Sequence, residues 1–155
     1  MENKMGFMET YTRIVNKHIL NQKIPKDYGV GFLLYPSEIH TIAAIGLNPG
    51  INCMNLSKKM GVTRGATSQI INRLESKNLI HKYKKEGNRK EVCVKLNELG
   101  FIAYENQKKI GSKFYKNLHK KIEGASQNEI DFLVKIFKEL ENFVDMRIGD
   151  GSKND

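Results

Sequence analysis

The sequence has no long apolar run and no leader-like start. Its longest apolar candidate, residues 29–35, is seven residues long, far short of the roughly 20 that a membrane-spanning helix needs. The first residues open a mixed segment instead of the apolar core of a signal peptide. We therefore expect a cytoplasmic protein without a membrane partner.

Cysteine is scarce, and the residues of common reaction sites are not grouped. Cys53 and Cys93 are the only two cysteines and form no C-x-x-C pair, which disfavours a disulfide framework or a structural zinc site. The four histidines lack the H-x-x-x-H spacing of metal ligands. Ser-His-Asp, paired-carboxylate and Walker-type groupings are also missing. We expect no metal, no cofactor and no enzymatic activity.

Positive charge is plentiful and is concentrated in one region. The formal net charge is +9. Residues 37–100 carry eleven Lys or Arg against five Asp or Glu, so six of the nine excess charges fall in this middle segment. A basic segment of this kind favours a surface that binds a polyanion.

Helical periodicity flanks this segment. Residues 4–20 predict a helix, and residues 23–36 predict a connection, since they contain two Pro and two Gly. Ser37 is expected to cap a helix that ends before Pro49. Residues 98–122 predict a long helix, and a capping-box pattern at Ser126 opens another. That last helix carries a heptad-like seam at Ile130, Leu133, Phe137, Leu140 and Val144.

Residues 56–74 have the pattern of a helix-turn-helix. Gly61 permits the left-handed turn, and Thr63 can cap a second helix that runs to Lys77 or Asn78. In this motif the second helix lies in the major groove of DNA. Eight residues are expected to face the DNA: Thr63, Arg64, Thr67, Ser68, Gln69, Asn72, Arg73 and Lys77.

These side chains suit different parts of a duplex. Arg64 can pair with guanine or phosphate, while Gln69 and Asn72 can form bidentate pairs with adenine. Arg73 and Lys77 are expected to contact the backbone. The alternative is a plain helical hairpin with a solvated polar face.

A basic hairpin follows the second helix. Residues 79–83 and 91–96 predict two strands around a polar loop. In the second strand Val92, Val94 and Leu96 alternate with Glu91, Cys93 and Lys95. Such a wing can place its tip in the minor groove. The expected contacts are Lys82, Lys84, Lys85, Asn88, Arg89 and Lys90. A winged helix used for protein assembly is the rival hypothesis, but it would not need a cationic wing.

Residues 34–100 resemble the winged-helix regulators of the MarR family. The matching segments are Pro36-Ser37-Glu38, Pro49-Gly50, Leu74-Glu75-Ser76-Lys77-Asn78-Leu79-Ile80, Asn88-Arg89-Lys90 and Leu96-Asn97-Glu98-Leu99-Gly100. The resemblance implies a homodimer that binds a pseudo-palindromic operator. It also implies repression that is relieved by a small phenolic or other anionic ligand, or by oxidation of a cysteine.

The chain departs from the family at the wing. The family usually has Asp-x-Arg there, whereas this chain has Asn88 and Lys90. Lysine is strongly hydrated, so it leaves water for a narrow groove less readily than a guanidinium group. We favour Arg89 as the side chain that enters the minor groove, and Lys90 remains the alternative.

The fold class that we expect is mainly α with a small β-hairpin wing. Residues 37–97 would form the winged helix-turn-helix, residues 1–36 and 98–148 a helical dimerisation region, and residues 149–155 a polar tail. A possible ligand pocket between the DNA-binding and dimer regions involves four side chains, although we favour the core for them. They are Tyr28, Phe32, Tyr35 and His40.

Overall fold

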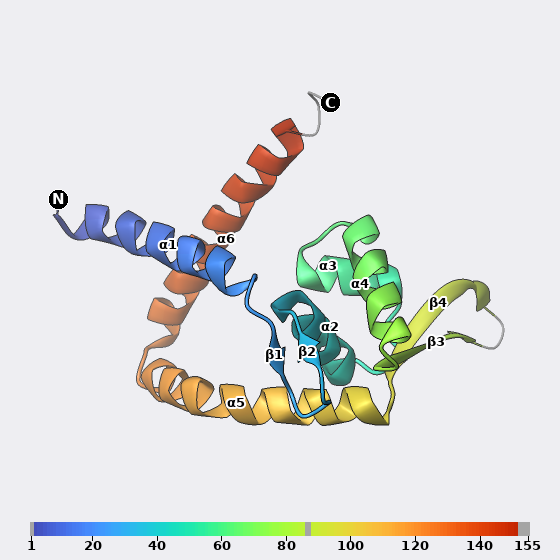
Figure 1. The fold of residues 1–155 in the computed structure, drawn as a ribbon. Helices are drawn as coiled ribbons and strands as arrows, with labels where there is room; N and C mark the ends of the chain where they lie inside the picture. The colour runs from blue at the N-terminus through green and yellow to red at the C-terminus, as the bar shows by residue number, and fades with distance from the viewer. Residues whose placement is uncertain (1, 86–87, 152–155) are drawn as a thin grey trace. The chain divides into compact units, whose positions relative to one another are not determined.

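The computed structural model describes residues 2–85 and 88–151 and divides into two units, residues 1–110 and 111–155. The first unit holds α1 (Glu2–Asn21), β1 (Lys26–Asp27), β2 (Leu33–Leu34), α2 (Pro36–Leu47), α3 (Cys53–Met60), α4 (Arg64–Ser76), β3 (Ile80–Lys85), β4 (Asn88–Leu96) and the first part of α5 (Glu98–Glu123) (Figure 1). The second unit holds the rest of α5 and α6 (Gln127–Gly151). The expected fold class, mainly helical with a small hairpin wing, is confirmed.

The core of the first unit joins the helix-turn-helix to α2 and to the base of the wing. Its fully covered side chains are Leu34, Ile39, Ile42, Leu56, Leu74, Leu79 and Val94. Burying one Leu or Ile contributes about 1.5–3 kcal/mol. The same residues therefore stabilise the unit and hold α3 and α4 against each other.

The start of α2 differs from the sequence prediction. Tyr35, and not Ser37, is the N-cap, because Pro36 occupies the first helical position, where its fixed φ and missing N–H are tolerated. The Glu38 carboxylate accepts a hydrogen bond of 2.9 Å from the backbone N–H of Tyr35. The other end is as expected, since α2 stops at Leu47 before Pro49.

Three further segments differ from the sequence prediction. The connection over residues 23–36 contains a short hairpin, in which Lys26 pairs with Leu34 and Asp27 pairs with Leu33. Helix α3 begins at Cys53, earlier than the apolar pattern indicates, because the Asn52 side chain caps it by accepting from the N–H of Asn55. Helix α6 runs to Gly151, into the stretch expected as a polar tail.

The wing strands are longer than predicted and are covered on both faces at one point. Strand β3 pairs with β4 in antiparallel register, from Ile80 opposite Leu96 to Lys84 opposite Val92. Cys93 and Val94, which alternate in the strand pattern, are both fully buried. The segment before α3 also lies along the other edge of β4, with the Val94 N–H donating to the Ile51 carbonyl at 3.0 Å.

The apolar positions of the long helices are largely exposed in the single chain. In α6, Phe137 is 65% exposed and Phe132 is 63% exposed. In α1, Ile14 and Leu20 are also exposed. Within the described residues, no helix combines the length and apolar character needed to cross a membrane.

Candidate nucleic-acid interface

The turn between α3 and α4 is built as the local pattern indicates. Gly61 ends α3 with φ +64, a left-handed conformation that costs other residues more than glycine. Thr63 caps α4, since its side-chain oxygen accepts a hydrogen bond of 3.1 Å from the N–H of Ala66. The inward face of α4 is then fixed by Ile70, Ile71 and Leu74, all buried.

Most of the expected recognition residues lie on the exposed face of α4. The exposed ones are Thr63 at the N-cap and, within α4, Arg64, Ser68, Gln69, Asn72 and Arg73. Arg64 extends back to α3, where its guanidinium donates to the Met54 sulfur at 3.2 Å. This face therefore presents both amide and guanidinium groups, which suit base edges and phosphates.

Thr67 does not belong to that face. Its side chain is 1% exposed, and its hydroxyl donates to the carbonyl oxygen of Thr63 at 3.1 Å. The sequence prediction that Thr67 contacts DNA is corrected here. The residue supports the first turn of α4 instead.

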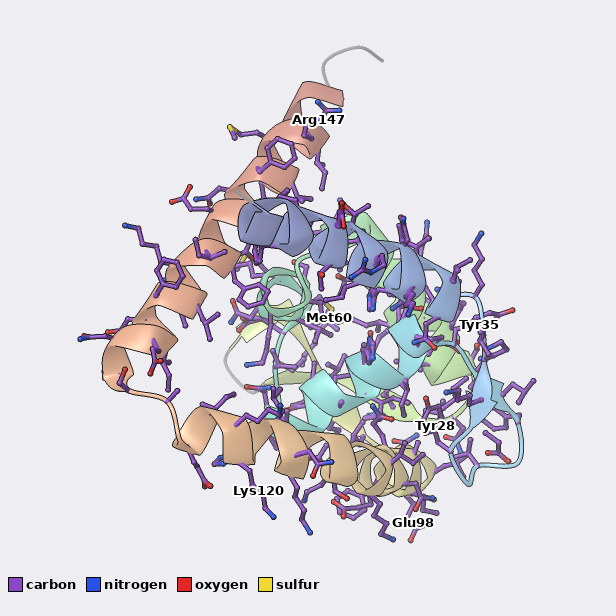
Figure 2. The ribbon with its side chains drawn as sticks, turned by 90° about the vertical axis from the view of Figure 1, so that its left-hand side faces the viewer. Tyr28, Tyr35, Met60, Glu98, Lys120 and Arg147 are labelled. Carbon is purple, nitrogen blue, oxygen red and sulfur yellow. The ribbon has the colours of Figure 1, made fainter. Side chains whose placement is uncertain are left out.

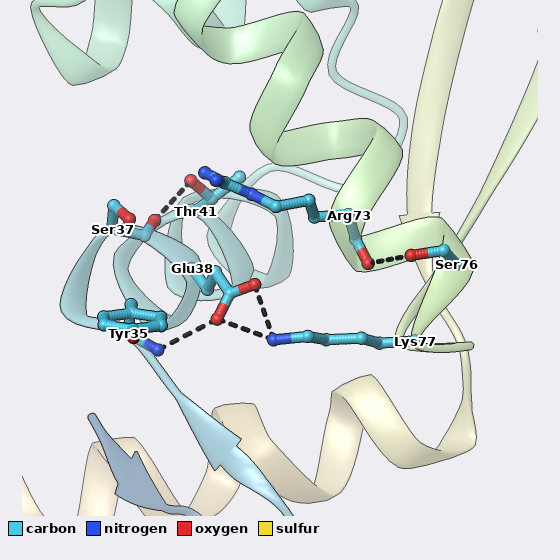
Figure 3. Close-up of polar contacts among 7 residues, drawn as sticks. All are labelled: Tyr35, Ser37, Glu38, Thr41, Arg73, Ser76 and Lys77. Atoms are coloured by element: carbon cyan, nitrogen blue, oxygen red, sulfur yellow. Dashed lines mark hydrogen bonds and ion pairs between the residues drawn. The ribbon is translucent and has the colours of Figure 1, made fainter.

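Lys77 is engaged in an internal ion pair. Its ammonium lies 2.7 Å and 2.9 Å from the two carboxylate oxygens of Glu38 (Figure 3). Glu38 is 1% exposed, and the ring of Phe32 lies 5.9 Å below the ammonium. A buried carboxylate needs such a partner. Lys77 therefore connects the end of α4 to α2, and the phosphate contact that the sequence suggested stays a prediction.

Lys82 at the base of the wing is likewise held by α4. Its ammonium donates to Asn72 Oδ1 at 2.6 Å and pairs with Glu75 Oε2 at 2.6 Å. The hydrogen bond from Lys82 lowers the pKa of the Glu75 carboxyl. Figure 1 shows β3 and β4 extending beyond α4 as a two-stranded arm. Lys84 on that arm is exposed.

The tip of the wing is described only in part. The loop at residues 86–87 lies outside the described residues, and so do the side chains of residues 85 and 88–90. The expected contacts Lys85, Asn88, Arg89 and Lys90 fall there. The choice between Arg89 and Lys90 for the minor groove remains a prediction.

A basic hollow beside the helix-turn-helix was missed by sequence reasoning. Lys58 and Lys59 of α3 are exposed and, with Asn55 and residues 48–51, line a hollow of about 590 Å³. The sequence signal was available, because two adjacent lysines in the first helix of such a motif lie near the backbone that this helix crosses.

The four residues of the possible ligand pocket separate into two groups. Tyr28 is buried and Phe32 is half-buried against the core, whereas Tyr35 is half-exposed. Tyr28 and Tyr35 are labelled in Figure 2. Asn106 of α5 donates to the backbone carbonyl of Tyr28 at 2.9 Å. His40 lies at the surface, where partial burial and then the charge of His18 lower its pKa. The core interpretation suits Tyr28 and Phe32.

The cysteines have the surroundings of structural residues. Cys93 is fully buried. Burial raises the pKa of the Cys53 thiol, and the nearby charge of Lys82 only partly offsets this. A raised pKa lowers the thiolate fraction on which redox sensing depends. In the part of the chain that the structure describes, no group of three or more His, Cys, Asp or Glu could hold a metal ion.

These features together define a class of protein. A capped helix with an exposed polar face, a short helix packed across its start and an adjoining basic hairpin are the parts of a winged helix-turn-helix that binds DNA.

Known proteins agree with this assignment. The MarR family model matches residues 34–92. An uncharacterized HTH-type transcriptional regulator of Bacillus subtilis, YhjH, is 25% identical over 119 residues, covering 77% of this chain and 68% of the relative. The crystal structure of Streptococcus pneumoniae FabT in complex with DNA matches with a TM-score of 0.62 and 27% identity, over 92% of this chain and 97% of that one.

A further solved structure shows the same fold. The adhesin competence repressor AdcR of Streptococcus pyogenes matches with a TM-score of 0.68 at 14% identity, over 89% of this chain and 97% of that one. Residues 34–92 match the MarR family model, and the chain is similar in sequence and fold to DNA-binding transcriptional regulators.

Proposed function

We propose that the protein is a dimeric repressor that recognises a pseudo-palindromic operator and is released from it by a small ligand. The observation that carries sequence-specific binding is the exposed row of Arg64, Ser68, Gln69 and Asn72 on α4, directly beside the wing. The similarity to FabT, which was solved with DNA, supports it.

The exposed apolar residues of α1 and α6 support a dimer. Phe137 and Phe132 present their rings to solvent in the single chain, and a second copy of the same helices is a surface that could cover them. Two copies would then carry two recognition helices to successive major grooves, about 34–36 Å apart.

A series of hydrogen bonds connects a surface residue to the end of α4, and this supports release by a ligand. Tyr35 is half-exposed and donates its backbone N–H to Glu38, which in turn holds Lys77 at the end of α4. A small phenolic or anionic molecule that displaces Tyr35 would loosen this connection. The recognition helix would then shift relative to α2.

The test is selection of duplexes from a random library by the full chain, followed by anisotropy titration of the selected site at several salt concentrations. We expect an inverted repeat and an affinity that falls steeply with salt. Salicylate serves as the phenolic anionic probe and should weaken binding in the wild type. A protein that binds no duplex would instead favour a winged helix used for protein assembly, and one that binds every duplex alike would contradict the recognition of a specific operator.

A further inference from the structure

Asn72 of the recognition helix is held by a lysine of the wing. The ammonium of Lys82 on β3 lies 2.6 Å from Asn72 Oδ1 and 2.6 Å from Glu75 Oε2. Asn72 and Glu75 are three residues apart, so they are neighbours on one face of α4. The Lys82 side chain is 28% exposed and that of Glu75 is 40% exposed, which leaves this contact at the edge of the DNA-facing surface.

The chemistry of the contact determines which way the amide of Asn72 faces. An ammonium group has three donors and no acceptor. The amide atom beside Lys82 must therefore be the oxygen, whichever way the side-chain amide would otherwise be assigned. The NH2 group, with two donors, is the part of Asn72 that remains available to another molecule.

This orientation conflicts with the adenine contact that the sequence suggested. Bidentate pairing with adenine needs the amide oxygen to accept from N6 while the amide nitrogen donates to N7. The oxygen has a second lone pair, but an amino group that approached it would lie against the Lys82 ammonium. Two donors would then compete at one acceptor, which disfavours adenine.

Guanine fits the same group of atoms. Its major-groove edge offers two acceptors, N7 and O6, and the two N–H donors of the Asn72 amide can supply hydrogen bonds to them. We propose that Lys82 acts as a positioning residue that makes Asn72 a donor-only reader, selecting guanine over adenine at one operator position. This inference rests on the proposed sequence-specific DNA binding.

Duplex selection with the full-length wild type and three variants tests the inference. Asn72→Asp keeps an acceptor for Lys82 but has no donor for guanine. Lys82→Met removes the ammonium and frees the amide oxygen for adenine. Lys95→Met is the matched control, since it removes a charge from an exposed position on the paired strand β4 that is assigned no DNA contact. Thermal unfolding of each variant shows whether the fold is retained.

The wild type and Lys95→Met should favour G·C over A·T about tenfold at one position. Asn72→Asp should lose that preference, and Lys82→Met should shift it toward A·T. The inference is overturned by a wild-type preference for A·T at the position that depends on Asn72, or by an unchanged G·C preference in Asn72→Asp. The base preference of Asn72→Asp tests the inference even if Lys82→Met fails to fold. A wild type that selects no sequence removes the proposed function first, and the inference with it.

Discussion

At the scale of single residues, the surroundings of each lysine decide whether it can act on DNA. Lys77 faces the buried carboxylate of Glu38, and Lys82 is shared between Asn72 and Glu75. Lys58, Lys59 and Lys84 are exposed. Lys77 and Lys82 therefore connect elements of the fold to each other. Lys58, Lys59 and Lys84 remain available for phosphates.

The Lys77 assignment gives a prediction with a matched control. Lys77→Met leaves Glu38 buried without its cation, so we expect a loss of about 1–3 kcal/mol in the free energy of unfolding and an unchanged salt slope of DNA binding. Arg73→Met, at an exposed position on α4, should keep the free energy of unfolding within about 0.5 kcal/mol of the wild type. It should reduce the slope of log affinity against log salt concentration by about one unit. Urea unfolding and salt titrations measure both. The reverse pattern would place Lys77 on a phosphate.

Gly100 is required by a close backbone approach. A methyl group on residue 100 would overlap the carbonyl oxygen of Leu79, and a backbone atom cannot rotate away from it. Gly100→Ala should therefore cost about 1–3 kcal/mol or more. Gly65→Ala is the control, because its methyl would meet nothing closer than the Thr63 hydroxyl at 4.0 Å. Thermal unfolding at equal protein concentration should show a lower midpoint for the first variant only.

At the scale of elements, local signals set the helix ends wherever the capping residues are neighbours in sequence. The start of α6 shows the expected capping box, since the Glu129 carboxylate accepts from the backbone N–H of Ser126 at 2.8 Å and from its hydroxyl at 2.7 Å. The N–H of Glu129 lies 3.4 Å from the same hydroxyl. The α3–α4 turn, with Gly61 and Thr63, is equally local.

This cap makes a pH-dependent contribution with a defined sign. The Ser126 hydroxyl, and then its backbone N–H, lower the pKa of Glu129 below its ordinary 4.5. A carboxyl with a lowered folded-state pKa stabilises the fold above its unfolded pKa, and this stabilisation disappears as the pH falls through the folded value. Glu129→Gln should lower the melting temperature near pH 7, and the difference should shrink below pH 4.5. Glu141→Gln, at an exposed position of the same helix, is the control and should leave the melting temperature near pH 7 unchanged.

At the scale of the whole molecule, the exposed apolar helices predict the oligomeric state. Phe137 lies in the heptad-like seam of α6 and is 65% exposed. A charge at this position would be buried if two copies pair through the seam, and an unpaired buried charge is costly. We expect the wild type to be dimeric at micromolar concentration by light scattering and Phe137→Asp to be monomeric.

The adjacent position provides the control. Lys138→Asp changes charge on the same helix turn at an exposed residue, and it should leave the dimer intact. A monomeric wild type, or a single unrepeated half-site in the selected DNA, would contradict the dimer.

The sequence alone determined the parts of this protein that depend on neighbouring residues. Helical and strand periodicity located the helix-turn-helix and wing, Gly61 and Thr63 marked the turn and cap, and the clustered charge indicated a polyanion partner. These signals are local, because backbone preferences and capping act over three or four residues.

Only the tertiary structure decided which of the polar residues face outward. Lys77 meets Glu38 from 39 positions away, and Lys82 meets Asn72 from 10 away across two different elements. Thr67 lies on the helix face turned toward the core, although its type suits DNA as well as Ser68 does. A charged or polar side chain pairs with whatever the fold places beside it, so its role follows from packing between elements and not from the local pattern.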